Sequence, residues 1–126
     1  MTVRESDILD LIDRLVAACA PEKVVLFGSH AYGAPRPDSD VDLLVVMPFD
    51  GKSRDKALKL WSLLRPRVPV DLLVRRPEDV ARRYEQWDPL IREALDKGKV
   101  LYERHGAGVA GQVGGRLARR PARAGG

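Results

Sequence analysis

Cysteine and long apolar runs are scarce in this sequence of 126 residues, and each shortage excludes a class of protein. Because Cys19 is the single cysteine, the chain can form neither an internal disulfide nor a thiolate metal cluster. No apolar run approaches the roughly 20 residues that a membrane-spanning helix needs. The amino terminus carries acidic residues where a secretory signal would be basic and then apolar. We therefore expect a cytoplasmic protein that does not associate with membranes.

Acidic residues are absent after Glu103, and this absence changes the meaning of the net charge of +4. Residues 104–126 contain five arginines, whereas residues 1–103 hold 17 basic and 18 acidic residues, a net charge of −1. A near-neutral folded part argues against a basic nucleic-acid-binding face. The last part consists mostly of Gly, Ala and Arg, which bury too little apolar surface to offset the entropy lost on ordering. We expect one domain over 1–103 and a disordered tail over 104–126, either a solvated extension or a segment that contacts an acidic partner.

Hydrophobic periodicity and turn residues divide the domain into predicted helices and strands. A capping box of Thr2 and Glu5 is expected to open a helix that ends before Pro21, and Ser53 is expected to cap a helix that ends before Pro66. Further helical turns are expected over 30–33, from Pro77 onward and over 89–97. Continuous apolar runs predict strands over 23–27, 40–46, 70–74 and 100–102. The bulky aromatic residues that we expect in core or partner contacts, and not as a nucleobase platform, are Trp61, Tyr84 and Trp87.

Gly28 and Ser29 directly follow the strand predicted over 23–27 and precede a predicted helical turn. A glycine lets a phosphate approach the backbone, and the serine hydroxyl and exposed N–H groups can bind it. Taken alone the pair is weak evidence, because turns between strands and helices often use Gly-Ser.

Asp40 and Asp42 stand at the start of the strand predicted over 40–46. Successive side chains of a strand alternate between its faces, so these two carboxylates are expected on the same side. They repel each other unless a cation lies between them. The alternative interpretation is that Asp40 only ends the loop while Asp42 caps a neighbouring helix.

Asp71 is the second residue of the strand predicted over 70–74. This segment has the same sequence, Val-Asp-Leu-Leu-Val, as residues 41–45. If the two strands are neighbours in a sheet, Asp71 can face Asp40 and Asp42. An unpaired carboxylate in a buried strand is costly, so three of them at one edge indicate a divalent cation. Hard oxygen ligands without histidine or cysteine favour Mg²⁺ over zinc.

Together these residues resemble the motif of the DNA polymerase beta-like nucleotidyltransferase superfamily, and more narrowly its minimal nucleotidyltransferase group. The resemblance rests on Leu-Phe-Gly-Ser at 26–29, Ser-Asp-x-Asp-Leu at 39–43, Asp71 and the closing Val-Leu-Tyr at 100–102. It covers about residues 3–103. Each piece is common, but their order and spacing seldom coincide by chance.

The resemblance implies an α/β (α+β) fold with a mixed sheet flanked by helices. It also implies that Gly28 and Ser29 hold the triphosphate of ATP, and that Asp40, Asp42 and Asp71 bind Mg²⁺. Asp71 would in addition help to deprotonate the incoming hydroxyl. Two metals would steady the attacking and departing oxygens of an in-line displacement.

The turn after Gly-Ser departs from the pattern of the family. Relatives often carry arginines there, whereas this chain has His30 and Tyr32. Either phosphate affinity from this turn is lower, or Arg36 supplies the positive charge for nucleotide binding. For His30, a hydrogen-bonding or exposed role is favoured over a role as catalytic acid or base.

Small stand-alone members of the group resemble antitoxins that work with a helical HEPN partner. The leading hypothesis from this resemblance is a nucleotidyltransferase that moves AMP from ATP to a tyrosine of a HEPN-type ribonuclease toxin and so neutralises it. A second hypothesis is an antitoxin that neutralises by binding alone. A third is a nucleotidyltransferase acting on a small molecule such as an aminoglycoside.

Overall fold

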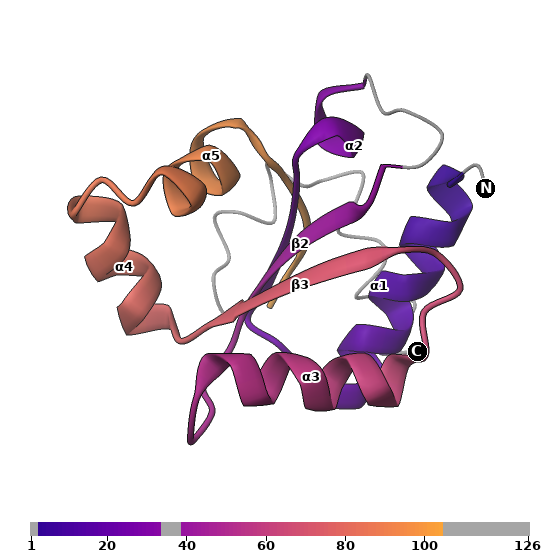
Figure 1. The fold of residues 1–126 in the computed structure, drawn as a ribbon, viewed down its shortest axis with the longest axis horizontal. Helices are drawn as coiled ribbons and strands as arrows, with labels where there is room; N and C mark the ends of the chain where they lie inside the picture. Colours follow the sequence, from indigo (N-terminus) through magenta and orange to yellow (C-terminus); the bar gives the residue numbers. More distant parts are fainter. Residues whose placement is uncertain (1–2, 34–38, 105–126) are drawn as a thin grey trace.

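One mixed sheet of four strands, with helices on both of its faces, forms the centre of this computed structural model, which describes residues 3–33 and 39–104 (Figure 1). The predicted fold class, a mixed sheet flanked by helices, is therefore confirmed. In chain order the elements are α1 (Glu5–Cys19), β1 (Lys23–Phe27), α2 (Ser29–Tyr32), β2 (Val41–Val46), α3 (Ser53–Leu64), β3 (Val70–Arg75), α4 (Pro77–Glu85), α5 (Pro89–Lys97) and β4 (Lys99–Glu103).

The strands lie in the order β3-β2-β1-β4, so β3 and β4 form the two edges. β1 is antiparallel to both β2 and β4, whereas β2 and β3 are parallel and are joined by the crossover helix α3. A parallel pair requires such a crossover, because a tight turn can join only antiparallel strands. This pairing brings the start of β2 beside the start of β3.

Alternating strand residues fill two separate apolar cores, one on each face of the sheet. On one face Leu43 and Val45 of β2 pack against α1 and α3, whose contributions include Leu15 and Leu60. On the other face Leu44 packs with residues of β1, α4 and α5. Figure 1 shows the same layers, with α1 and α3 on one side of the strands and α4 and α5 on the other.

Two predicted helix starts are wrong, and hydrogen bonding explains both. The residue before α1 is Arg4, whose backbone N–H donates to the Asp7 carboxylate at 2.9 Å, so Asp7 takes the place expected for Glu5. Thr2 lies outside the described residues. Ser53 is the first residue of α3 and not its cap, because its hydroxyl donates to the backbone carbonyl of Val74.

Of the helices in the described ranges, none combines the length and the apolar character needed to cross a membrane. The tail expected over 104–126 lies, after Arg104, outside the described residues, so its disorder stays a prediction.

Gly98 gives a test of how closely α5 approaches the sheet. A Cβ added to Gly98 would lie 2.3 Å from the carbonyl oxygen of Ala94 and 2.8 Å from that of Leu26. Because neither backbone group can move without disturbing α5 or β1, we expect Gly98→Ala to lower the free energy of unfolding by about 1–3 kcal/mol. Urea denaturation measures this change. The exposed neighbour Lys99→Ala is the control and should stay within about 0.5 kcal/mol of the parent; equal effects would contradict the close approach.

Candidate active site

Gly28 forms the bend between β1 and α2, and only glycine fits there. Its φ of 78° and ψ of −163° fall in a region that is essentially restricted to glycine. A Cβ at this position would also lie 2.2 Å from the Oδ2 atom of Asp42. The bend therefore lets the backbone touch a carboxylate. Ser29, the other residue of the predicted pair, is the half-exposed first residue of α2.

The pairing of the strands brings the aspartates of β2 and β3 together. In the antiparallel pair β1–β2, Phe27 lies opposite Asp42, and in the parallel pair β2–β3, Asp42 lies beside Asp71. The expectation that the two Val-Asp-Leu-Leu-Val segments are neighbours is thus confirmed. β2 starts at Val41, one residue later than predicted, so Asp40 directly precedes the strand. The three aspartates therefore gather at the end of the sheet next to Gly28.

The three carboxylates differ in their environments. Asp40 and Asp71 are exposed, whereas Asp42 is half-buried. Burial raises the pKa of the Asp42 carboxyl above its ordinary value of 3.8, and the negative charges of Asp71, Asp40 and Glu93 raise it further, while His30 lowers it. The protein thus holds Asp42 in a place where its negative charge is unfavourable, which is typical of functional sites.

His30 ties the segment before β2 to α2. Its Nε2–H donates to the backbone carbonyl of Ser39 at 3.1 Å, one residue before Asp40. The hydrogen-bonding role expected for His30 is confirmed, and this contact positions the strand entrance.

Glu93 is a fourth acidic group near the site that the sequence interpretation missed. It lies on α5, where its carboxylate accepts a 2.7 Å hydrogen bond from the hydroxyl of Tyr32 on α2. The negative charge of Glu93 raises the pKa of Asp42, and burial, the hydrogen bond to Glu93 and the charges of Glu93 and Asp42 raise the pKa of Tyr32. No local motif marks Glu93, because only the packing of α5 against β1 brings it to this end of the sheet.

The aspartates suit a magnesium ion that arrives with a nucleotide better than a closed protein cage. Within residues 3–33 and 39–104, no three Asp, Glu, His or Cys side chains are arranged so that they could hold a metal ion by themselves. Mg²⁺ is usually bound in proteins through one or two carboxylates together with substrate phosphates and water. The paired Asp42 and Asp71, with Asp40 beside them, provide such oxygen ligands.

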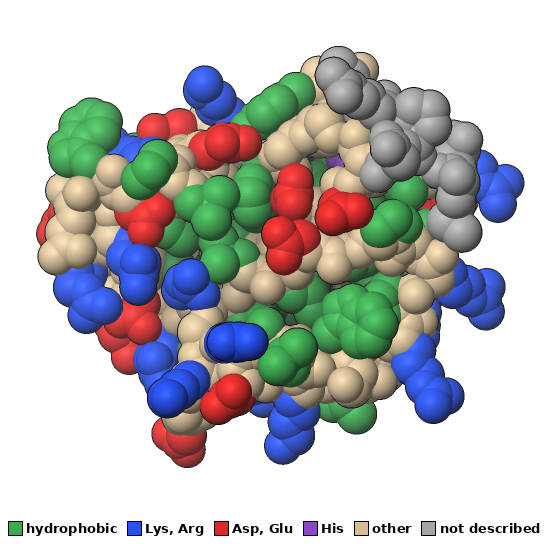
Figure 2. Space-filling view, in the orientation of Figure 1, with side chains coloured by type: hydrophobic (Ala, Val, Ile, Leu, Met, Phe, Trp, Pro, Cys, Tyr) green, Lys and Arg blue, Asp and Glu red, His purple; other side chains and the backbone are tan. Residues whose placement is uncertain are grey.

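Figure 2 shows the surface of this site. Acidic side chains gather near the centre of the view, over the part of the sheet next to α2, with apolar surface on both sides of them. Arg36, proposed from the sequence to bind the nucleotide, lies outside the described residues.

With this fold and this arrangement of glycine and aspartates established, comparison with known proteins defines the class. Residues 10–106 match the family described as "Polymerase beta, Nucleotidyltransferase", and the chain belongs to this family. It is a nucleotidyltransferase. The resemblance inferred from the sequence motifs is confirmed.

Individual relatives narrow the comparison. The chain is 32% identical over 83 residues to the protein MJ0604 of Methanocaldococcus jannaschii, which is provisionally named a protein adenylyltransferase; the match covers 64% of this chain and 78% of that protein.

Solved structures share the fold at low sequence identity. A toxin–antitoxin complex crystallised with AMP-PNP matches with a TM-score of 0.52 at 23% identity, over 79% of this chain and 76% of that one. The MntA–HpeT toxin–antitoxin, with two aspartates changed to glutamate, matches with a TM-score of 0.51 at 22% identity and the same coverage.

Gly28→Ala combines a clash with Asp42 and backbone strain, because the φ of 78° and ψ of −163° at this position suit only glycine. We expect Gly28→Ala to lower the free energy of unfolding by about 3 kcal/mol, and by about 2 kcal/mol less in an Asp42→Ala background, where the clashing carboxylate is gone. Chemical denaturation of the two single variants, the double variant and the parent measures the difference. Equal losses in the two backgrounds would show that Asp42 does not constrain the bend.

The raised pKa of Asp42 predicts a pH-dependent stability. The native state holds this proton more tightly than the unfolded state, so the free energy of unfolding falls as pH rises through 3.8 towards the raised value. Asparagine does not ionise, so Asp42→Asn removes this pH-dependent fall in the free energy of unfolding. We expect the variant to gain stability relative to the parent between about pH 3 and about pH 7. The midpoints of urea denaturation at the two pH values measure the gain in stability of the variant over the parent. The exposed Asp50→Asn is the control. A difference in stability between variant and parent that does not depend on pH would contradict the prediction.

Proposed function

We propose that this protein transfers AMP from ATP to a hydroxyl group of a partner protein, and that the acceptor is a tyrosine of a HEPN-type ribonuclease toxin. The observation that carries the proposal is the register of β2 and β3, which sets Asp42 beside Asp71 next to the Gly28 bend. Two carboxylates beside an accessible backbone turn suit a triphosphate and Mg²⁺ better than they suit structural stability.

Each residue has a role that follows from its position. Gly28 and Ser29 bind the triphosphate, since the bend lets phosphate oxygens approach the backbone. Asp42 and Asp71, with Asp40 beside them, would supply oxygen ligands to an Mg²⁺ ion that arrives with the phosphates, and the ion would neutralise charge on those phosphates. Asp71, as an exposed carboxylate, accepts the proton of the attacking hydroxyl. The hydroxyl oxygen forms a bond to the α-phosphorus, the bond from that phosphorus to the bridging oxygen breaks, and pyrophosphate leaves.

A protein acceptor is supported by the open form of the site and by the relatives. Asp40 and Asp71 are exposed at the end of the sheet next to Gly28, and Asp71 lies on an edge strand, so a macromolecule can reach both. The relative in Methanocaldococcus jannaschii carries the name of a protein adenylyltransferase, and two solved neighbours are toxin–antitoxin complexes, one of them with an ATP analogue.

Transfer of label tests the proposal. Incubation with Mg²⁺, ATP labelled in its α-phosphate and the protein encoded by the neighbouring gene should label that protein on tyrosine. We expect Asp42→Ala and Asp71→Ala to reduce the rate by about 100-fold or more, because electrostatic stabilisation of the transferring group is lost. The exposed Asp50→Ala should retain full activity.

A non-catalytic antitoxin is the second candidate, favoured by large apolar side chains on the surface, among them Trp87 at 72% exposure and Leu90 at 43%. The same variants separate the two candidates. Neutralisation of the partner that persists in Asp42→Ala and Asp71→Ala, without any transfer of label, would replace the catalytic proposal with this one. Label that appears only on added hydroxylated small molecules would indicate a small-molecule nucleotidyltransferase.

A further inference from the structure

The edge strand β3 and helix α3 enclose a groove that begins beside the aspartates. Its volume is about 460 Å³, and its lining includes Asp71 and Arg75, near the two ends of β3. The α3 wall contributes Leu58 and Trp61, which are 60% and 48% exposed. In Figure 1, α3 runs antiparallel to β3, so Trp61 lies towards the Asp71 end.

The far end of the groove carries a positive charge without a carboxylate partner. Arg75 donates to the Ser53 hydroxyl and to the carbonyl of Val74, both neutral groups, and its Nε atom is buried without a hydrogen-bond partner. Among the described residues, no carboxylate lies within 4.0 Å of this guanidinium, although neighbouring arginines such as Arg76 each have one. Arg75 is therefore a half-buried cation that is available to an anion.

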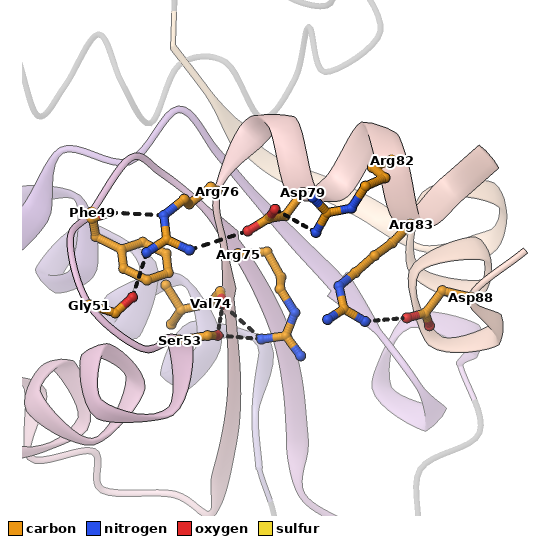
Figure 3. Close-up of polar contacts among 10 residues, drawn as sticks. All are labelled: Phe49, Gly51, Ser53, Val74, Arg75, Arg76, Asp79, Arg82, Arg83 and Asp88. Carbon is orange, nitrogen blue, oxygen red and sulfur yellow. Dashed lines mark hydrogen bonds and ion pairs between the residues drawn. The ribbon is translucent and has the colours of Figure 1, made fainter. Parts of the chain in front are cut away.

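Arg83 of α4 increases the positive potential at this place. Figure 3 shows the side chains of Arg75 and Arg83 extending into the same space, with Asp88 bound to Arg83 and not to Arg75. Burial and the charge of Arg83 together lower the pKa of Arg75 from its usual value. Asp88 and Asp79 act in the opposite direction on this pKa, but both carboxylates form their ion pairs with other arginines. Arg54, which is exposed, also lines the groove.

The nucleotide does not account for this positive charge. Arg75 pairs in register with Val46, and Asp71 with Asp42, so Arg75 lies at the opposite end of the sheet from the Gly28 bend. The four residue steps between Asp71 and Arg75 correspond to roughly 13 Å along the strand. A triphosphate held at the bend and the aspartates places its negative charge at the other end, so an anion at Arg75 must come from the second substrate.

We propose that the groove along β3 binds an extended segment of the acceptor protein, with the hydroxyl to be modified at Asp71 and a carboxylate of the same segment at Arg75. This inference rests on the proposed transfer to a protein. The apolar wall at Leu58 accommodates the middle of the segment, and Trp61 lies where it can pack against the ring of an acceptor tyrosine. The charges of the groove, acidic at one end and basic at the other, thus match a segment with a hydroxyl and an acid at opposite ends.

The edge position of β3 supports an extended occupant. Within the described residues β3 pairs only with β2, so one row of its backbone N–H and C=O groups has no strand partner. Polypeptides commonly bind such edges as an added strand. At about 3.4 Å per residue, the distance from Asp71 to Arg75 predicts an Asp or Glu about four positions from the modified tyrosine.

Leu58 and Leu63 provide a matched pair of variants. Both lie on α3 with nearly equal exposure, 60% and 61%, but only Leu58 lines the groove. The probe is the protein encoded by the neighbouring gene. We expect Leu58→Glu to raise the KM for this acceptor protein about tenfold, and to raise the Kd of the complex between the two proteins by the same factor. Leu63→Glu should change neither value. Because both leucines are exposed, neither substitution should impair folding.

Arg75→Gln tests the charged end, with the exposed Arg67→Gln as a control that removes the same charge outside the groove. We expect a rise of about tenfold in the KM of the acceptor for Arg75→Gln, as for loss of one charge-assisted hydrogen bond, and an unchanged KM for ATP. Peptide mapping of the label then identifies the nearby acid of the acceptor. Changing that acid to lysine should be compensated by Arg75→Glu.

The possible results distinguish failure of the proposed groove from failure of the proposed reaction. Label transfer that is unaffected by Leu58→Glu and Arg75→Gln overturns the groove and leaves the proposed function standing. A raised KM for ATP in these variants also overturns it, since the groove would then hold the nucleotide. If the parent protein transfers no label, the proposed function fails; the Kd alone then decides, with a tenfold loss in Leu58→Glu supporting a docking groove and an unchanged value overturning it.

Discussion

Two carboxylates on adjacent strands, held side by side by the parallel register of β2 and β3, are the constraint on which the rest of this molecule depends. Their repulsion opposes folding, and the half-buried position of Asp42 adds a cost of desolvation. The apolar strand residues that follow Asp42 and pack on both faces of the sheet offset this cost. Gly28 is part of the same constraint, because any larger residue would displace the carboxylate.

The face of the sheet that carries Asp42, Asp71 and Arg75 is organised along the direction of the strands. One end is acidic and lies beside the Gly28 bend, and the other end presents Arg75, whose Nε atom has no hydrogen-bond partner among the described residues. Contacts made by side chains far apart in the sequence stabilise the acidic end, including the hydrogen bond between Tyr32 and Glu93. Within the described residues no strand pairs with the outer edge of β3, and a groove runs along it between the two ends.

Most of the fold could be predicted because its signals are local. The apolar run at 23–27 and the helix at 89–97, with proline at its start and Gly98 after it, agree with the elements in the structure. The errors concern hydrogen bonds with partners that are distant or that compete nearby. Ser53 has the residue type of a helix cap, but a carbonyl of β3 takes its hydroxyl.

The sequence by itself determined the candidate groups: the glycine and serine after a buried strand, the alternating pair Asp40 and Asp42, and the repeated text around Asp71. It could do so because turn geometry and the two-residue period of a strand are local properties. Only the tertiary structure decided that Asp71 lies beside Asp42, that Glu93 approaches them and that Arg75 bonds to Ser53 and Val74 and to no carboxylate among the described residues. These relations depend on strand order and helix packing, which are set by how the whole chain buries its apolar surface.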